Sequence, residues 1–128
     1  MKVINPDTMM LPQGGYSQGI QAGDLIFVAG QVGVDAHGNP TGDAGMAAQT
    51  RQTIANVAAV LAEAGATLAD VVSATVYVKE FSEYKVFDQV WQECFGGHRP
   101  ARATVKADLV HPALLIEVQA VAVRPVSR

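Results

Sequence analysis

The segment LLIEVQAVAV, residues 114–123, decides the fold of this chain. Apolar residues occupy every even-numbered position of the segment, namely Leu114, Ile116, Val118, Ala120 and Ala122. Side chains alternate between the two faces of a strand, so this pattern predicts a strand with one wholly apolar face. The odd-numbered positions are also largely apolar, with Leu115, Val121 and Val123 beside Glu117 and Gln119. A strand of this kind must be covered on both faces.

Four further strands and two helices are predicted around this segment. The strands are expected at 18–23, 24–30, 70–78 and from Ala101 onward, and the helices at 42–65 and 82–95. Gly23 and Asp24 favour a hairpin turn, Gly65 is suited to end the first helix, and Ser82 is suited to cap the second. The 128 residues therefore predict one domain, 1–128, of the α+β or α/β class, with one sheet and two helices.

The second apolar face of the last strand predicts self-association. Two helices cover only one face of a sheet, and the chain offers no third layer for the other face. We therefore expect a homo-oligomer that associates through the uncovered face.

Composition excludes several classes of function. The net charge of −3 lacks the basic footprint of a general nucleic-acid or membrane-surface binder, and no segment has the length of apolar residues that a membrane span needs. The first ten residues lack the apolar run of a signal peptide, and the single cysteine fits a reduced cytoplasm. The three histidines show no metal-binding spacing, so we expect no metal site.

Arg102 and Glu117 are the candidate functional residues. Pro100 can open a strand, which places Arg102 at the strand's start, on the same face as Thr104. The guanidinium fork matches a small carboxylate, and a glutamate on a covered apolar face could orient or activate water as a general base. We expect the two to share a polar pocket at an interface. Two structural interpretations stay open: Arg102 as a surface cation or ion-pair partner, and Glu117 in a salt bridge between subunits.

Five motifs, taken together, resemble those of one family. They are GGYSQG at 14–19, FVAGQVGVD at 27–35, the run from Thr50 to Val78, RPARATV at 99–105 and IEVQAVAV at 116–123. This set resembles the RidA (YjgF/YER057c/UK114) family of reactive-intermediate deaminases. The resemblance implies a chorismate-mutase-like fold with one mixed sheet, two helices on one of its faces, and a homotrimer whose sheets pack inward. It also implies sites between subunits that hydrolyse enamines and imines, such as 2-aminoacrylate and 2-aminocrotonate, to 2-keto acids and ammonia.

The resemblance further implies a role for individual residues. Arg102 would clamp the substrate carboxylate, and Glu117 would position the attacking water. Tyr16 would line the pocket, while Gly30 and the carbonyl group of Thr104 would contact substrate through the main chain. No cofactor and no metal are implied.

Several positions depart from the family pattern and leave the substrate open. Arg99 stands where an aromatic residue is common, Ala29 where a serine is usual, Thr104 where Cys or Ser is frequent, and Asp88 where an asparagine is frequent. Arg99 would favour a larger or dianionic substrate. The alternatives are a non-catalytic carboxylate-binding or chaperone-like trimer, and a pathway-specific deaminase acting on a larger imine such as aminomuconate. An endoribonuclease is less favoured, because the chain is acidic and shows no evident His/Lys catalytic pair.

Overall fold

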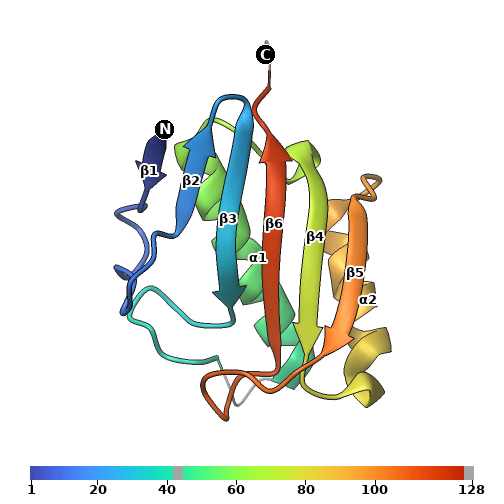
Figure 1. Cartoon of the computed structure of the whole chain (residues 1–128). Coiled ribbons are helices and arrows are strands. Elements are labelled where there is room, and N and C mark those ends of the chain that lie inside the picture. The colour runs from blue at the N-terminus through green and yellow to red at the C-terminus, as the bar shows by residue number, and fades with distance from the viewer. Residues whose placement is uncertain (42–44, 126–128) are drawn as a thin grey trace.

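The computed structural model describes residues 1–41 and 45–125 and contains one mixed sheet with two helices. Its strands are β1 (Lys2–Ile4), β2 (Gly19–Ala22), β3 (Leu25–Val32), β4 (Val71–Val78), β5 (Ala101–Lys106) and β6 (Ile116–Val123). The helices are α1 (Gly45–Glu63) and α2 (Tyr84–Phe95), with short 3-10 turns at Leu68–Asp70 and Phe81–Glu83. The strand order is β1-β2-β3-β6-β4-β5, and only the β4–β5 pair is parallel among these strands. Both helices lie behind the sheet in Figure 1, which confirms the α+β class and the two-layer arrangement.

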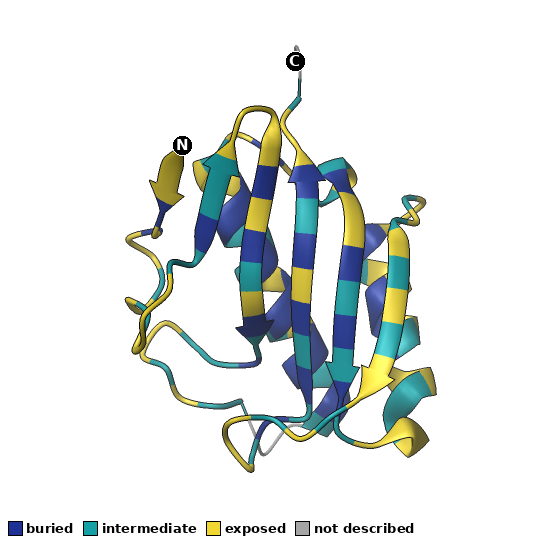
Figure 2. Cartoon of the chain, viewed as in Figure 1, coloured by how far each residue is buried: buried dark blue, intermediate teal, exposed yellow. Residues whose placement is uncertain are grey.

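Strand β6 lies in the interior of the sheet, a position that the sequence pattern did not predict. It is antiparallel to β3 on one side and to β4 on the other. Its even-numbered residues are all buried against the helices, and the alternation is visible as bands along the strand in Figure 2. The largest core side chain among them, Ile116, is fully buried, as is Phe87 of α2. Burying such a side chain contributes about 1.5–3 kcal/mol to folding.

The local signals were partly right. Gly23 and Asp24 form the turn between β2 and β3, with Gly23 at a φ of 60°. Gly65 has a φ of 74° just after α1, where the absence of a side chain permits the reversal. Ser82 was wrongly predicted to cap α2: it lies inside a 3-10 turn, and Glu83 occupies the cap position without a side-chain hydrogen bond.

The first helix is described from Gly45 onward, and its predicted residues 42–44 lie outside the described residues. The last strand begins at Ile116, two residues later than predicted. Strand β1 was not predicted. It has three residues and pairs with β2 from Lys2↔Gln21 to Ile4↔Gly19, so tertiary pairing and not local pattern defines it.

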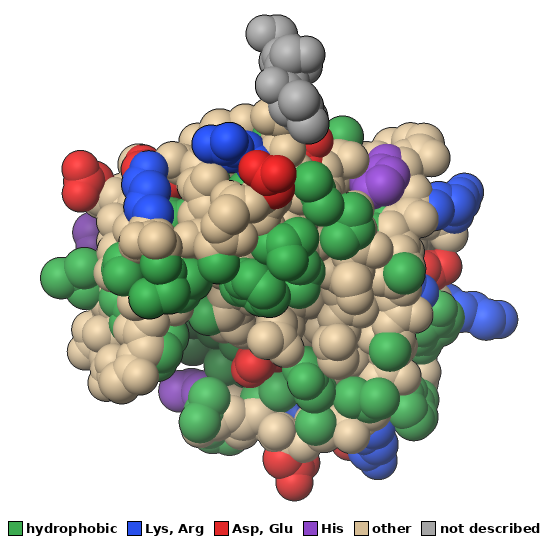
Figure 3. All heavy atoms as spheres, turned by 45° about the horizontal axis from the view of Figure 1, so that its top comes forward, with side chains coloured by type: hydrophobic (Ala, Val, Ile, Leu, Met, Phe, Trp, Pro, Cys, Tyr) green, Lys and Arg blue, Asp and Glu red, His purple; other side chains and the backbone are tan. Residues whose placement is uncertain are grey.

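The face of the sheet opposite the helices is apolar and uncovered in the single chain. Leu25 and Phe27 of β3, Val105 of β5 and Val123 of β6 are between 38% and 43% exposed on this face. Figure 3 shows hydrophobic side chains gathered on the surface turned toward the viewer. Isolated exposed apolar residues are ordinary, but a contiguous patch of them marks an interaction surface. We call the face of the sheet opposite the helices, which carries Leu25, Phe27, Val105 and Val123, the open face. Within the described residues, no helix is long and apolar enough to cross a membrane.

Candidate active site

Arg102 lies at the edge of the sheet and its guanidinium group is held by α2. Nη1 donates a hydrogen bond to Oδ1 of Asp88 at 2.8 Å, and Nη2 donates to the hydroxyl oxygen of Tyr84 at 2.6 Å. Tyr84 and Asp88 are four residues apart, so both face β5 from the same side of the helix. The side chain is 16% exposed, so Arg102 is neither a free surface cation nor fully enclosed.

Three aromatic rings surround the same guanidinium group. Its Cζ lies 5.0 Å from the ring centre of Phe87, 5.1 Å from that of Trp91 and 5.7 Å from that of Tyr84. These are distances at which a ring face attracts a cation. The rings and the two hydrogen bonds hold the guanidinium group in one place, which favours binding of a planar anion because little side-chain freedom remains to be lost.

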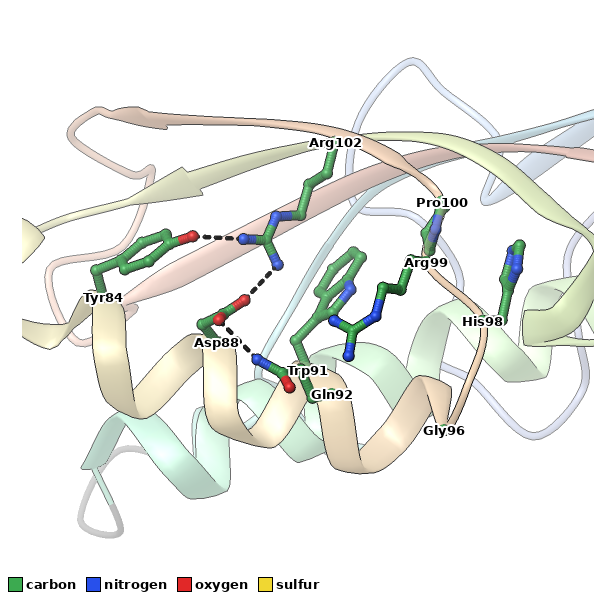
Figure 4. A pocket seen from close by; sticks show the side chains of 9 residues that line it. All are labelled: Tyr84, Asp88, Trp91, Gln92, Gly96, His98, Arg99, Pro100 and Arg102. Carbon is green, nitrogen blue, oxygen red and sulfur yellow. Dashed lines mark hydrogen bonds and ion pairs between the residues drawn. The ribbon is translucent and has the colours of Figure 1, made fainter.

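A hollow of about 360 Å³ opens beside this group. We call it the Arg102 hollow; its lining residues are Tyr84, Asp88, Trp91, Gln92, Gly96, His98, Arg99, Pro100 and Arg102. Figure 4 shows Arg102 reaching from β5 toward the helix, with Tyr84, Asp88 and Gln92 linked by dashed lines and Arg99 farther along. Burial alone would raise the pKa of Asp88. The hydrogen bonds from Arg102 and Gln92 and the charges of Arg102 and Arg99 outweigh it, so that pKa is lowered and Asp88 is ionised at neutral pH.

Glu117 lies on the open face above a glycine. A Cβ atom on Gly30 would be only 2.1 Å from Oε2 of Glu117, so the carboxylate occupies the space that any side chain at position 30 would need. The register between β3 and β6 shifts here: Val28 pairs with Ala120 and Gln31 with Val118, leaving two β3 residues opposite one. This is a β-bulge, a feature frequent near active sites.

The Glu117 carboxylate has no hydrogen-bonding or ion-pair partner within residues 1–41 and 45–125. The side chain is half-buried, and this desolvation raises the pKa of Glu117 above the ordinary glutamate value. It lines a second hollow, of about 490 Å³, together with Gly30, Tyr77, Gln119 and residues 107–110; we call it the Glu117 hollow. An unpaired carboxylate with a raised pKa, placed in a hollow, has the properties of a general base.

The structure corrects the expected neighbourhood of Arg102 and Glu117. Arg102 pairs with Ala74, which pairs with Ala120, and both alanines are buried on the helix side of the sheet. Glu117 pairs with Tyr77 on the opposite face. Strand β4 also separates β5 from β6, although β5 and β6 are consecutive in sequence. Within one chain, the two residues therefore do not share a pocket.

The other predicted site residues, Tyr16, Gly30 and Thr104, lie at different parts of the chain's surface and sheet. Tyr16 is 56% exposed on the loop before β2 and lines a third hollow, of about 540 Å³, which also includes Gly30. Thr104 follows Arg102 on the helix side of β5. Two residues were missed: Tyr84, which accepts a hydrogen bond from Arg102, and Tyr77, which lies opposite Glu117. The spacing of Tyr84, Asp88 and Trp91 on one helix face was the available signal for the first.

The described residues offer no cluster of three or more His, Cys, Asp or Glu side chains suited to a metal ion. The side chains at these hollows can supply carboxylate binding at Arg102 and proton transfer at Glu117.

Comparison with known proteins finds similar sequences and structures over nearly the whole chain. The family model described as Endoribonuclease L-PSP matches residues 7–124. A RutC family protein of Pyrococcus abyssi is 39% identical over 121 residues, which cover 94% of this chain and 95% of the relative. The 3-aminoacrylate deaminase RutC of Acinetobacter baylyi is 31% identical over 121 residues, covering 94% and 96%. The crystal structure of the YjgF gene product of E. coli superposes with a TM-score of 0.90 at 32% identity, covering 98% of this chain and 100% of the other.

The fold and the site together define a class of protein. It is a two-layer α+β domain that carries an arginine at the edge of its sheet and a half-buried glutamate on its open face. The chain belongs to the RidA/YjgF/L-PSP (RutC) family, which includes enamine and imine deaminases.

Proposed function

We propose that the protein is an enamine/imine deaminase that hydrolyses 2-aminoacrylate, 2-aminocrotonate or their imines to 2-keto acids and ammonia. The observation that carries the proposal is the Arg102 guanidinium group, held by two hydrogen bonds and three aromatic rings beside an open hollow. Guanidinium has five N–H donors, so donors remain for a substrate carboxylate. The deaminase name of one relative supports the reaction class.

We further propose that the working unit is a homotrimer with its sites between subunits. The open face presents apolar residues that a second copy would cover, and covering them would remove Leu25, Phe27 and Val105 from water. Since Arg102 and Glu117 face opposite sides of one sheet, a pocket that contains both requires two copies of the chain. The sheet edge that carries Arg102 would then meet the neighbour's Glu117 hollow.

In this proposed site Arg102 and Glu117 have separate roles in the reaction. Arg102 holds the substrate carboxylate and thereby fixes the C=N carbon. An enamine first tautomerises to its imine. Glu117 accepts a proton from a water molecule as that water adds to the carbon of the protonated imine, which forms a carbinolamine with a neutral amino group. Glu117 returns this proton to the nitrogen, and the C–N bond then breaks while the carbinolamine hydroxyl group gives up its proton to Glu117. The products are the 2-keto acid and ammonia. Such imines also hydrolyse unaided in water, so positioning and modest acid–base assistance account for the required acceleration.

A coupled assay tests the proposal. A threonine dehydratase generates 2-aminocrotonate at neutral pH, and formation of 2-oxobutanoate is followed with and without the protein. We expect acceleration by the wild type, none by Arg102→Ala, and full acceleration by Arg51→Ala, which removes an exposed arginine paired with Glu93. Unchanged acceleration by Arg102→Ala in an intact oligomer would refute the carboxylate clamp.

The alternatives give different results in the same experiment. A carboxylate-binding trimer would bind 2-oxobutanoate through Arg102 without accelerating its formation. A deaminase specific for a larger imine would be inactive here and active on an aminomuconate-like enamine, which Arg99 at the rim of the Arg102 hollow would favour. An endoribonuclease, as the family model's description suggests, would cleave RNA with or without Arg102.

A further inference from the structure

Arg102 already has a carboxylate partner inside its own chain. Asp88 accepts a hydrogen bond from Nη1 at 2.8 Å, and its second oxygen accepts one from Nε2 of Gln92 at 2.9 Å. The Asp88 side chain is 28% exposed, so water screens this pair only in part. Asp88 is thus fixed on both oxygens beside the group to which a ligand carboxylate would bind.

This arrangement changes what the site attracts. Within the Arg102 hollow, the charge of Arg102 is matched by that of Asp88, and Arg99 is the remaining arginine. Both terminal nitrogens of Arg102 already donate, one to Asp88 and one to Tyr84. A ligand carboxylate must therefore bind to the remaining N–H groups with Asp88 close by, or displace Asp88 from Nη1. In either position it meets a like charge.

We infer that Asp88 is a specificity-determining residue that weakens the binding of simple carboxylate anions to Arg102 relative to carboxylates that carry a positive charge. The inference rests on the proposed function, since it takes Arg102 as the carboxylate site. A ligand with a cationic nitrogen near its carboxylate has no net charge, so the Asp88 charge opposes it much less.

The difference between a zwitterionic and an anionic carboxylate is also the difference between the proposed substrate and its product. A 2-imino acid with a protonated nitrogen is a zwitterion, whereas the 2-keto acid formed from it is an anion. Asp88 would therefore favour release of product from a site built to hold a carboxylate. An asparagine at this position would keep an oxygen for Nη1 and remove the charge, so it would hold the product more tightly.

The test measures dissociation constants for two stable probes, 2-oxobutanoate as the anion and L-serine as the zwitterion. Isothermal titration is carried out on the wild type, Asp88→Asn, Asp88→Ala and Arg102→Ala. We expect Asp88→Asn to bind 2-oxobutanoate about tenfold more tightly, a modest value for removing a nearby like charge from a partly exposed site. Binding of L-serine should change by less than about threefold, because its ammonium group offsets the carboxylate.

Asp88→Ala should shift both affinities in the same direction as Asp88→Asn. The matched control is Glu63→Gln, which removes the same charge from α1 outside the Arg102 hollow and should alter neither probe. Equal changes for both probes, or weaker binding of 2-oxobutanoate by both Asp88 variants, would show that Asp88 only holds Arg102 in place and would overturn the inference.

Arg102→Ala separates the two proposals. If it binds 2-oxobutanoate as the wild type does, the carboxylate clamp of the proposed function fails. If it loses binding while Asp88→Asn resembles the wild type, only the role of Asp88 fails.

Discussion

Replacing Gly30 by alanine should reduce turnover strongly and stability little. The added Cβ would lie 2.1 Å from Oε2 of Glu117 and 2.9 Å from its Cδ. Carbon and oxygen atoms approach no closer than about 3.3 Å in such contacts, so the carboxylate has to move by roughly 1 Å. A misplacement of about 1 Å can cost on the order of a hundredfold in rate, and we expect a loss of that size in kcat.

The fold should tolerate the same change. Gly30 is not among the glycines with positive φ, so an alanine fits its backbone. The displaced atoms are the far end of a flexible side chain, and the change in the free energy of unfolding should stay within about 1 kcal/mol. The nearest atoms to the added Cβ belong to Glu117 and not to Arg102, which is proposed to hold the substrate, so KM should change far less than kcat.

The assay is the coupled formation of 2-oxobutanoate, with thermal unfolding measured in parallel. Gly97→Ala is the control, since a Cβ there meets no atom within 4 Å. The double variant Gly30→Ala/Glu117→Gln should be no slower than Glu117→Gln alone, because both act through one carboxylate. Wild-type kcat in folded Gly30→Ala, or additive losses in the double variant, would refute the reasoning that Gly30 leaves space for a working Glu117.

Three further outcomes are expected. Burial raises the pKa of Glu117, so folding favours the neutral form of this side chain. The variant Glu117→Gln should therefore be more stable than the wild type above pH 4.5, and the difference should vanish below that pH. Unfolding measured as a function of pH checks this. Thr53→Val should raise the free energy of unfolding by about 1 kcal/mol in denaturant titration, because the buried Thr53 hydroxyl has no partner among the described residues; a loss of stability would mean that the hydroxyl is satisfied. Phe27→Asp places a charge on the open face and should yield a monomer in sedimentation, whereas a trimer that persists would show that this face is not the interface.

Local patterns in the sequence were sufficient for both helices and for every strand except β1. The alternation along residues 114–123 predicted a strand with two largely apolar faces, and the pair Gly23-Asp24 predicted the hairpin. These signals depend on side-chain period and backbone preference, which a short segment carries by itself. The same alternation predicted that one face of the sheet is covered by a second copy of the chain.

Strand order and the partners of the site residues depended on the tertiary structure. The helix α2 connects β4 to a parallel β5, which leaves β6 to pair on the other side of β4, so β4 separates two strands that are consecutive in sequence. The register places Arg102 opposite Ala74 and Glu117 opposite Tyr77, so the two side chains lie on opposite faces of the sheet. The contact of Asp88 and Tyr84 with Arg102 arises from packing of α2 on β5, and the space over Gly30 arises from the bulge beside β6. Such contacts join residues that are distant in sequence, and no local period encodes them.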